Sequence, residues 1–170
     1  MSATCAVITV SDRCSRGVEA DLSGPHLRAA LEERGFCGVL GKVVPDDIGE
    51  IYAAIRDALT AGARFIITTG GTGIGPRDVT PQATAPFIAT PLPALEQFFT
   101  QESLKETHYA ALSRGHMGLT ATEPPALIVN IPGSLKAAKL AERALFPLLK
   151  HTFDQLDQDD RPEGTYADHE

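Results

Sequence analysis

Residues 68–81 read TTGGTGIGPRDVTP and follow the apolar run at residues 65–67. A short buried strand that leads into a glycine-crowded turn is typical of a parallel α/β sheet, where such a turn exposes backbone N–H groups to an anion. Arg77, Asp78 and several threonines add a cation, a carboxylate and hydroxyls, a mixture that flexible linkers seldom carry. We therefore predict an active-site loop here. The glycines that allow positive φ and close approach of a ligand are Gly70, Gly71, Gly73 and Gly75.

This loop belongs to neither of two familiar phosphate-binding classes. A P-loop needs Lys and Ser or Thr directly after its last glycine, whereas Gly75 is followed by Pro76 and Arg77. The dinucleotide-binding fingerprint needs two residues between its last two glycines, whereas Gly71, Gly73 and Gly75 are evenly spaced.

The net charge of −7 comes mainly from the C-terminal end. The 170-residue chain has 22 acidic and 15 basic side chains, and residues 154–170 hold seven of the acids and one of the bases. Residues 1–153 are therefore nearly neutral, with neither the basic stripe that nucleic acids need nor a lysine run for an anionic membrane. We expect no nucleic-acid or membrane partner, one domain over residues 1–153, and a poorly ordered acidic tail over residues 154–170.

The cysteines and the N-terminus bear on the cellular compartment. Cys5, Cys14 and Cys37 are odd in number, form no C-x-x-C pair and have no His at zinc-ligand spacing, so we expect free thiols in a reducing compartment. The N-terminus lacks the basic and long apolar regions of a signal peptide, and no apolar stretch is long enough to span a bilayer. These features predict a cytoplasmic protein.

Apolar runs alternate with stretches of helical spacing along the chain. Ile48, Ile51, Ile55 and Leu59, for example, share one helix face before Gly62 ends the helix. The order βαβαβ in the first half predicts parallel strands with right-handed crossovers. We expect an α/β fold, a three-layer sandwich with a mostly parallel central sheet and helices on both faces. The expected strands are residues 5–10, 39–44, 65–69 and 126–131, and the expected longer helices are residues 25–34, 48–61 and 137–149.

Prolines divide residues 81–113 into what we expect to be two short helices. Thr80 is the predicted N-cap of the first, with Pro81 at the first helical position. His108 and His116 have no Glu at metal-motif spacing, so surface or capping roles are favoured over metal ligation.

Polar residues follow four predicted strands, and parallel strands place all those ends at one edge of the sheet. Glycine-rich donors together with two or three carboxylates indicate a magnesium-assisted reaction on a phosphorylated substrate. Each Asp taken singly can also be explained as a helix cap or an Asx-turn, an explanation that weakens when three of them meet a phosphate loop, and Asn130 as a purely structural amide. Besides the glycine loop with Asp78, the candidates at this edge are Asp12, Asp46, Asn130, Pro132, Gly133 and Ser134.

Four sequence motifs together closely resemble the molybdopterin adenylyltransferase family, of the free-standing MogA type related to the G domain of gephyrin. They are VSDR at residues 10–13, VPDD at residues 44–47, TTGGTGIGPRDVTP, and NIPGS at residues 130–134. The similarity covers residue 5 to about residue 149. Relatives of the same fold, such as molybdenum insertase domains, usually lack the Gly-Pro-Arg-Asp-Val-Thr-Pro continuation. One departure is Leu135, where family members often have a second proline.

The resemblance implies an enzyme that uses ATP and Mg²⁺ to attach AMP to the terminal phosphate of molybdopterin, with release of pyrophosphate. It also implies a homotrimer and hand-over of the product to a molybdenum insertase. By position, the catalytic and metal-binding aspartates are Asp46 and Asp78. The implied substrate contacts are Ser103 and Ser113, with a phosphate cradle at Gly70, Gly71, Thr72 and Gly73.

A non-catalytic protein of the same fold is the alternative. It would bind molybdopterin or a nucleotide for delivery, or serve as a scaffold with a decayed site. Retention of Asp46 and Asp78 counts against decay but is compatible with a carrier.

Overall fold

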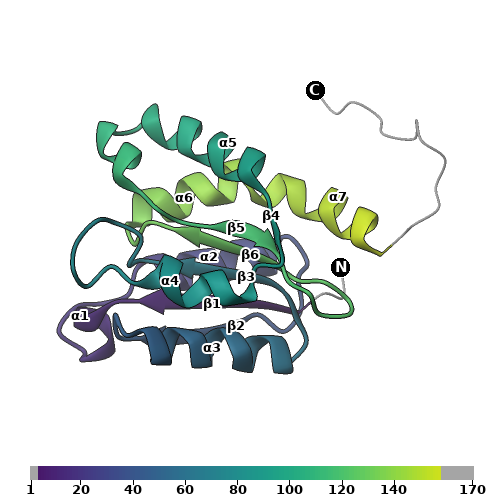
Figure 1. The fold of residues 1–170 in the computed structure, drawn as a ribbon, viewed down its shortest axis with the longest axis horizontal. Helices are drawn as coiled ribbons and strands as arrows, with labels where there is room; N and C mark the ends of the chain where they lie inside the picture. The colour runs from purple at the N-terminus through teal and green to yellow at the C-terminus, as the bar shows by residue number, and fades with distance from the viewer. Residues whose placement is uncertain (1–3, 158–170) are drawn as a thin grey trace.

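The computed structural model describes residues 4–157 as a six-stranded sheet between two layers of helices (Figure 1). The strand order is β2-β1-β3-β6-β5-β4, in which the first four strands are parallel and the last two pairings are antiparallel. The predicted α/β sandwich is confirmed. Among residues 4–157, no helix has both the length and the apolarity needed to cross a membrane. The strands are β1 (Thr4–Val10), β2 (Leu40–Val44), β3 (Ala63–Thr69), β4 (Thr90–Pro91), β5 (Met117–Leu119) and β6 (Leu127–Ile131).

The helices connect the strands and cover both faces of the sheet (Figure 1). They are α1 (Asp12–Ser15), α2 (Ser23–Glu33), α3 (Ile48–Thr60), α4 (Thr80–Thr84), α5 (Pro93–Leu104), α6 (Leu135–Ala144) and α7 (Phe146–Leu156), with short 3₁₀ helices η1 (Ala85–Phe87) and η2 (His108–Leu112).

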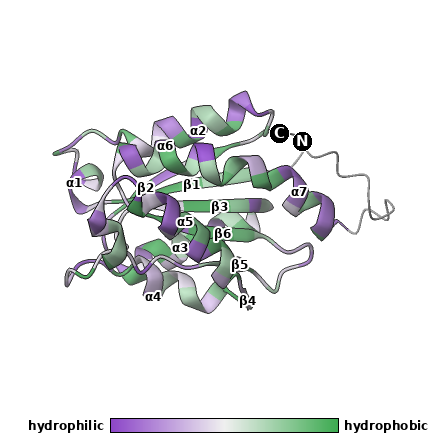
Figure 2. Ribbon diagram, turned by 90° about the horizontal axis from the view of Figure 1, so that it is seen from above, coloured by the Kyte–Doolittle hydropathy of each residue, from purple (hydrophilic) through white to green (hydrophobic). Residues whose placement is uncertain are grey.

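Alternating side chains of the parallel strands enter two separate hydrophobic cores. Cys5 and Val7 of β1 face α2, α6 and α7, whereas Ala6 and Ile8 face α3 and α4. All four are at most 2% exposed, as expected for a central strand that is buried on both faces. Figure 2 shows β1, β3 and β6 as largely hydrophobic strands, while the hydrophilic residues lie mostly on helices and loops.

The helix predicted over residues 137–149 is wrong as a single element. The chain forms α6 and then α7, which starts at Phe146 with Pro147 in its first turn. Proline has no N–H to donate, and inside a helix its ring clashes with the preceding turn. The helix therefore restarts at this point, because proline is well tolerated in a first turn.

Helix α7 runs into the stretch predicted as a poorly ordered tail. It ends at Leu156, and Lys150 Nζ lies 2.5 Å from Asp154 Oδ2 within it. Arg64 Nη1 lies 3.0 Å from Asp157 Oδ1 and ties the helix end to β3. The beginning of residues 154–170 is thus helical, and the rest of that stretch lies outside the described residues.

Strands β4 and β5 were not predicted from the sequence. The two helices expected between residues 81 and 113 are α4 and α5, and β4 lies between them. Thr90 and Gly118 belong to strands of two and three residues, which are too short to show an apolar run or an alternating pattern.

Candidate active site

Four loops meet at one edge of the sheet, where β1, β2, β3 and β6 end. The register pairs Val10 with Val44, Thr9 with Thr69, and Thr69 with Ile131, so the strands finish side by side. The predicted convergence at the carboxyl ends of the strands is confirmed. The loops carry Asp12, Asp46, the glycine loop (residues 70–79) and the Pro-Gly-Ser turn (residues 132–134).

Thr80 holds the carbonyl groups at the start of the glycine loop. Its hydroxyl donates to Gly70 O at 2.8 Å, and its N–H donates to Gly71 O at 3.0 Å. The prediction that Thr80 caps a helix is wrong, because α4 already includes Thr80 and its hydroxyl bonds the loop instead. Both glycines have positive φ, 110° at Gly70 and 64° at Gly71, which lets the chain turn at this point.

The other side of the glycine loop presents N–H groups. The C=O and N–H of a trans peptide point in opposite directions, so the held carbonyls turn the next N–H groups away from Thr80. Within residues 4–157, the N–H groups of Gly71, Thr72 and Gly73 donate to no protein acceptor. Successive N–H groups of this kind form a concavity for an anion. Gly70 differs, since its N–H donates to Ile131 O at 3.0 Å, so it shapes the turn.

The Pro-Gly-Ser turn packs closely against the glycine loop. Thr69 Oγ1 donates to Pro132 O at 3.2 Å. A Cβ added to Gly133 would lie 3.0 Å from Gly70 Cα, so glycine at this position allows the two turns to approach. Ser134 then caps α6, because its hydroxyl accepts from the Ala137 N–H at 3.1 Å.

The unusual Leu135 fits this turn. It is the first residue of α6, directly after the Ser134 cap. The first helical position is also the one where proline is favoured, so Leu135 stands at a position that either residue can occupy without changing the helix start.

Asp12 and Asp46 join their loops by reciprocal hydrogen bonds. The Asp12 N–H donates to Asp46 Oδ2 at 2.8 Å, and the Asp46 N–H donates to Asp12 Oδ1 at 3.1 Å. Arg77 donates two further bonds to the Asp12 carboxylate, at 3.1 and 3.0 Å. Asp12 therefore positions Asp46 and the glycine loop.

Burial and neighbouring charges shift the pKa values of two carboxyl groups at this edge. Burial, with the negative charges of Asp12 and Asp78 adding to it, raises the pKa of Asp46 above its ordinary value. Partial burial also pushes the pKa of Asp12 upward, but the Asp46 N–H and Arg77 outweigh it and leave that pKa below its ordinary value. Repulsion among neighbouring carboxylates is relieved by a bound cation.

We expect Asp46→Asn to stabilise the fold at neutral pH, with an unfolding midpoint about 1–4 °C higher. The raised pKa means that the folded state disfavours ionised Asp46, so this cost is present above the folded-state pKa. Thermal denaturation should show the gain near neutral pH, and the gain should vanish as the pH falls through the raised pKa to the ordinary carboxylate range. Asp47→Asn is the matched control, because Asp47 is exposed and only caps α3. A gain that is equal for both variants, or that persists in acid, would contradict the assignment.

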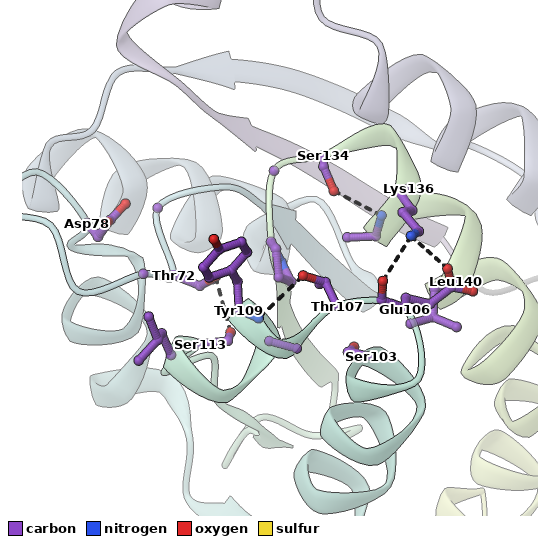
Figure 3. Close-up of a pocket in the computed structure, with 17 residues that line it drawn as sticks. Thr72, Asp78, Ser103, Glu106, Thr107, Tyr109, Ser113, Ser134, Lys136 and Leu140 are labelled. Carbon is purple, nitrogen blue, oxygen red and sulfur yellow. Dashed lines mark hydrogen bonds and ion pairs between the residues drawn. The ribbon is translucent and has the colours of Figure 1, made fainter.

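Asp78 closes the far end of the glycine loop and lines the cavity above it (Figure 3). Its Oδ2 accepts from the Gly75 N–H at 2.8 Å. Cβ atoms on Gly73 and Gly75 would lie 2.7 and 2.8 Å from that oxygen, so both glycines make room for the carboxylate. Within the described residues no donor bonds Asp78 Oδ1, which leaves this oxygen available to a ligand.

Two cavities adjoin at the glycine loop. The first has a volume of about 280 Å³ and is bounded by the loop, η2 and the start of α6 (Figure 3). The second, of about 370 Å³, lies toward α1 and α2. Gly71, Gly133 and Ser134 line both, Asp78 lines the first, and Asp46 lines the second. Two ligands could therefore meet at the boundary beside these carboxylates.

The structure brings most of the predicted site residues together. Gly70 and Asp46 line the second cavity, whereas Asp12 lines neither. Those that line the first cavity are Gly71, Thr72, Gly73, Asp78, Ser103, Ser113, Pro132, Gly133 and Ser134.

Asn130 belongs to the interior, with only 2% of its surface exposed. Its Nδ2 donates to Thr68 Oγ1 at 2.9 Å and to Thr84 Oγ1 at 3.1 Å, and its Oδ1 accepts from the His116 N–H at 3.0 Å. The amide is fully used by these neighbours and lines neither cavity. Its predicted contact with substrate is corrected to the structural role.

Sequence reasoning missed several residues around the first cavity. Tyr109 on η2 is 82% exposed and its ring lies at the cavity (Figure 3). Lys136 Nζ lies 2.9 Å from Glu106 Oε2, and Arg143 Nη2 lies 3.3 Å from Glu106 Oε1. The bond from Lys136, with Arg143, holds the pKa of Glu106 below its ordinary value. Of these residues, only Tyr109 carried a signal in the sequence, because it is an aromatic residue in a polar stretch.

Metal binding at this edge would need the substrate's oxygens. Within residues 4–157, no group of three or more His, Cys, Asp or Glu side chains is arranged to hold a metal ion. Mg²⁺ is usually bound by one or two carboxylates together with substrate phosphates, and Asp46 and Asp78 fit that pattern.

Cys14 and Cys37 are free thiols, as predicted, and burial raises the pKa of Cys5 to about 12.

Comparison with known proteins relates the chain to molybdenum cofactor biosynthesis. The family model described as "Probable molybdopterin binding domain" matches residues 6–151. The molybdenum cofactor synthesis protein cinnamon of Drosophila melanogaster is 41% identical over 93% of this chain, which spans only 26% of cinnamon. The molybdopterin adenylyltransferase of Pyrococcus furiosus is 36% identical over 85% of this chain and 88% of its own length.

Solved structures give the same result. The molybdopterin biosynthesis Mog protein from Mycobacterium ulcerans superposes with a TM-score of 0.84 at 34% identity, over 91% of this chain and 99% of that chain. The match of the family model over most of the sequence, the full-length relative and the shared fold lead to one conclusion. The chain belongs to the molybdopterin-binding domain family of molybdenum cofactor biosynthesis.

Proposed function

We propose that this protein is a molybdopterin adenylyltransferase, which transfers AMP from ATP to the terminal phosphate of molybdopterin and releases pyrophosphate. The observation that carries the proposal is the glycine loop, whose unpaired N–H groups lie where two cavities meet beside Asp46 and Asp78. Joining two phosphorylated substrates requires such a boundary. The full-length relative from Pyrococcus furiosus, named molybdopterin adenylyltransferase, supports the same reaction.

The reaction requires alignment of the two substrates and neutralisation of their negative charge more than it requires a general base. The second pKa of a phosphate monoester is about 6, so the attacking phosphate is mostly a dianion at neutral pH. One of its oxygens forms the bond to the α-phosphorus of ATP, and the bond from that phosphorus to the departing pyrophosphate breaks. The N–H groups of Gly71, Thr72 and Gly73 would hold and orient a phosphate during this exchange.

Asp46 and Asp78 are the carboxylates that would hold Mg²⁺. The ion, when bound, would offset the repulsion between the two anionic substrates and the developing charge on pyrophosphate. The raised pKa of Asp46, which comes from burial first and from the negative charges of Asp12 and Asp78 second, supports this role, because a bound cation would offset both costs.

Three further traits belong to the proposal. We expect a homotrimer, as the family resemblance implies, and sedimentation that showed a monomer would contradict it. Hand-over of the product to a molybdenum insertase is likewise proposed from the family resemblance. The exposed thiol of Cys37 suits a reducing cytoplasm.

The direct test is product formation from purified protein, molybdopterin, ATP and Mg²⁺. Chromatography should reveal adenylylated molybdopterin together with an equal amount of pyrophosphate. Binding of molybdopterin without formation of the adduct would overturn the proposal in favour of a carrier or scaffold.

A further inference from the structure

Arg114 holds the backbone of the glycine loop through three hydrogen bonds. It follows η2 and is half-buried. Its N–H donates to Thr72 O at 2.8 Å, its Nε to Gly73 O at 2.7 Å, and its Nη2 to Asp78 O at 2.6 Å. One residue, 41 positions from Gly73 in the sequence, therefore binds carbonyls at both ends of residues 72–78.

These contacts set the direction of the N–H groups. A planar trans peptide places the N–H of Gly73 opposite to Thr72 O, and the N–H of Ile74 opposite to Gly73 O. Thr80 holds Gly70 O and Gly71 O in the same way. Four successive carbonyls are thus held by protein donors. The direction of Gly73 N–H at the cavity wall depends on this anchorage.

Arg114 also fixes Asp78 through the main chain. The guanidinium bonds Asp78 O, while Asp78 Oδ2 accepts from the Gly75 N–H. The backbone and one carboxylate oxygen of Asp78 are then both held, which leaves Oδ1 directed by the loop. A displacement of about 1 Å at a reacting group can cost a hundredfold in rate, so this anchorage has consequences for chemistry.

Within residues 4–157, the partners of the Arg114 guanidinium are uncharged carbonyls, and it forms no ion pair. A guanidinium carries five donors in a fixed fork, and here the fork engages carbonyls that belong to the loop. The positive charge of a guanidinium bonded to the glycine loop favours an anion bound to the N–H groups of that loop.

We propose that Arg114 is a positioning residue of the proposed adenylyl transfer, setting the N–H groups of the glycine loop and Asp78 for a substrate phosphate. This rests on the proposed function for its reaction, but the anchorage itself can be measured separately. Arg114 acts through the loop and is not assigned contact with substrate.

The test compares Arg114→Gln with Arg114→Lys and a control. Arg64→Gln is the control, because Arg64 is also a half-buried arginine that donates to a loop carbonyl, Pro125 O at 2.9 Å, away from the glycine loop. We expect Arg114→Gln to speed hydrogen exchange of the bonded loop amides, those of Gly75, Asp78 and Thr80. We also expect it to raise KM for molybdopterin at least tenfold and to lower kcat/KM about a hundredfold. Arg114→Lys keeps the positive charge as a single point charge, so its KM and kcat/KM should lie between those of wild type and Arg114→Gln. Arg64→Gln should lose about as much thermal stability as Arg114→Gln but keep the wild-type KM.

The outcomes separate the two proposals. If wild type forms no adduct, the proposed function fails, while hydrogen exchange and equilibrium binding of molybdopterin still test Arg114. Unchanged exchange in the loop, or unchanged molybdopterin affinity in a folded Arg114→Gln protein, would overturn the positioning role. If the Gln variant does not fold, Arg114→Lys with wild-type KM and wild-type exchange would overturn it equally. Absence of molybdopterin binding to wild type would overturn both proposals.

Discussion

Asp78→Asn should lower kcat for adenylyl transfer by about a hundredfold or more while the fold stays intact. Asparagine has nearly the same shape and keeps an oxygen that accepts from the Gly75 N–H, a bond of 2.8 Å in the structure. What it removes is the negative charge that would hold Mg²⁺ beside the substrate phosphates. Initial rates at saturating ATP and molybdopterin, measured together with thermal denaturation, check the prediction.

Asp57→Asn is the control for this prediction. Asp57 is an exposed residue of α3 that pairs with Arg56 and Lys42, outside the four loops of the site. Asp57→Asn removes one negative charge, as Asp78→Asn does. A fall in kcat that occurs only in Asp78→Asn would therefore tie the effect to the site. A wild-type rate in a folded Asp78→Asn protein would sink the assignment of Asp78 to the reaction.

The fold could be predicted where the sequence pattern follows from burial. The runs that became β1 and β3 are apolar because both faces are covered, and Cys5 and Phe65 are fully buried. The break at Pro147 could also have been predicted, since proline seldom continues a helix. Strands β4 and β5 could not, because two or three residues around Gly118 carry no period and pair only once the sheet exists.

The site was predictable where it depends on strand order. Asp12, Asp46 and Asp78 follow strands whose ends parallel pairing must bring together. Contacts across long stretches of sequence gave no such signal. Nothing local to Arg114 reveals that it bonds Gly73 O and Asp78 O, and nothing local to Asn130 reveals that Thr68 and Thr84 use its amide.

Gly71→Ala should weaken the binding of molybdopterin about a hundredfold or more. A Cβ at this position would lie 2.4 Å from Thr80 Oγ1 and 3.1 Å from Asp46 Oδ1. The Thr80 hydroxyl would have to give up Gly70 O, and the row of N–H groups that begins at Gly71 would lose its direction. Equilibrium titration, followed through the pterin fluorescence, measures the loss.

Gly62→Ala separates this steric effect from backbone strain. Gly62 also has positive φ, 82° against 64° at Gly71, but a Cβ there would meet nothing within 4 Å. Backbone strain should cost both variants about 1–2 kcal/mol of stability, because alanine is strained at positive φ. Only Gly71→Ala adds a clash inside the anion site, so only it should lose affinity. Equal affinities for the two variants would mean that the phosphate is held elsewhere, and the glycine loop would then be a structural turn.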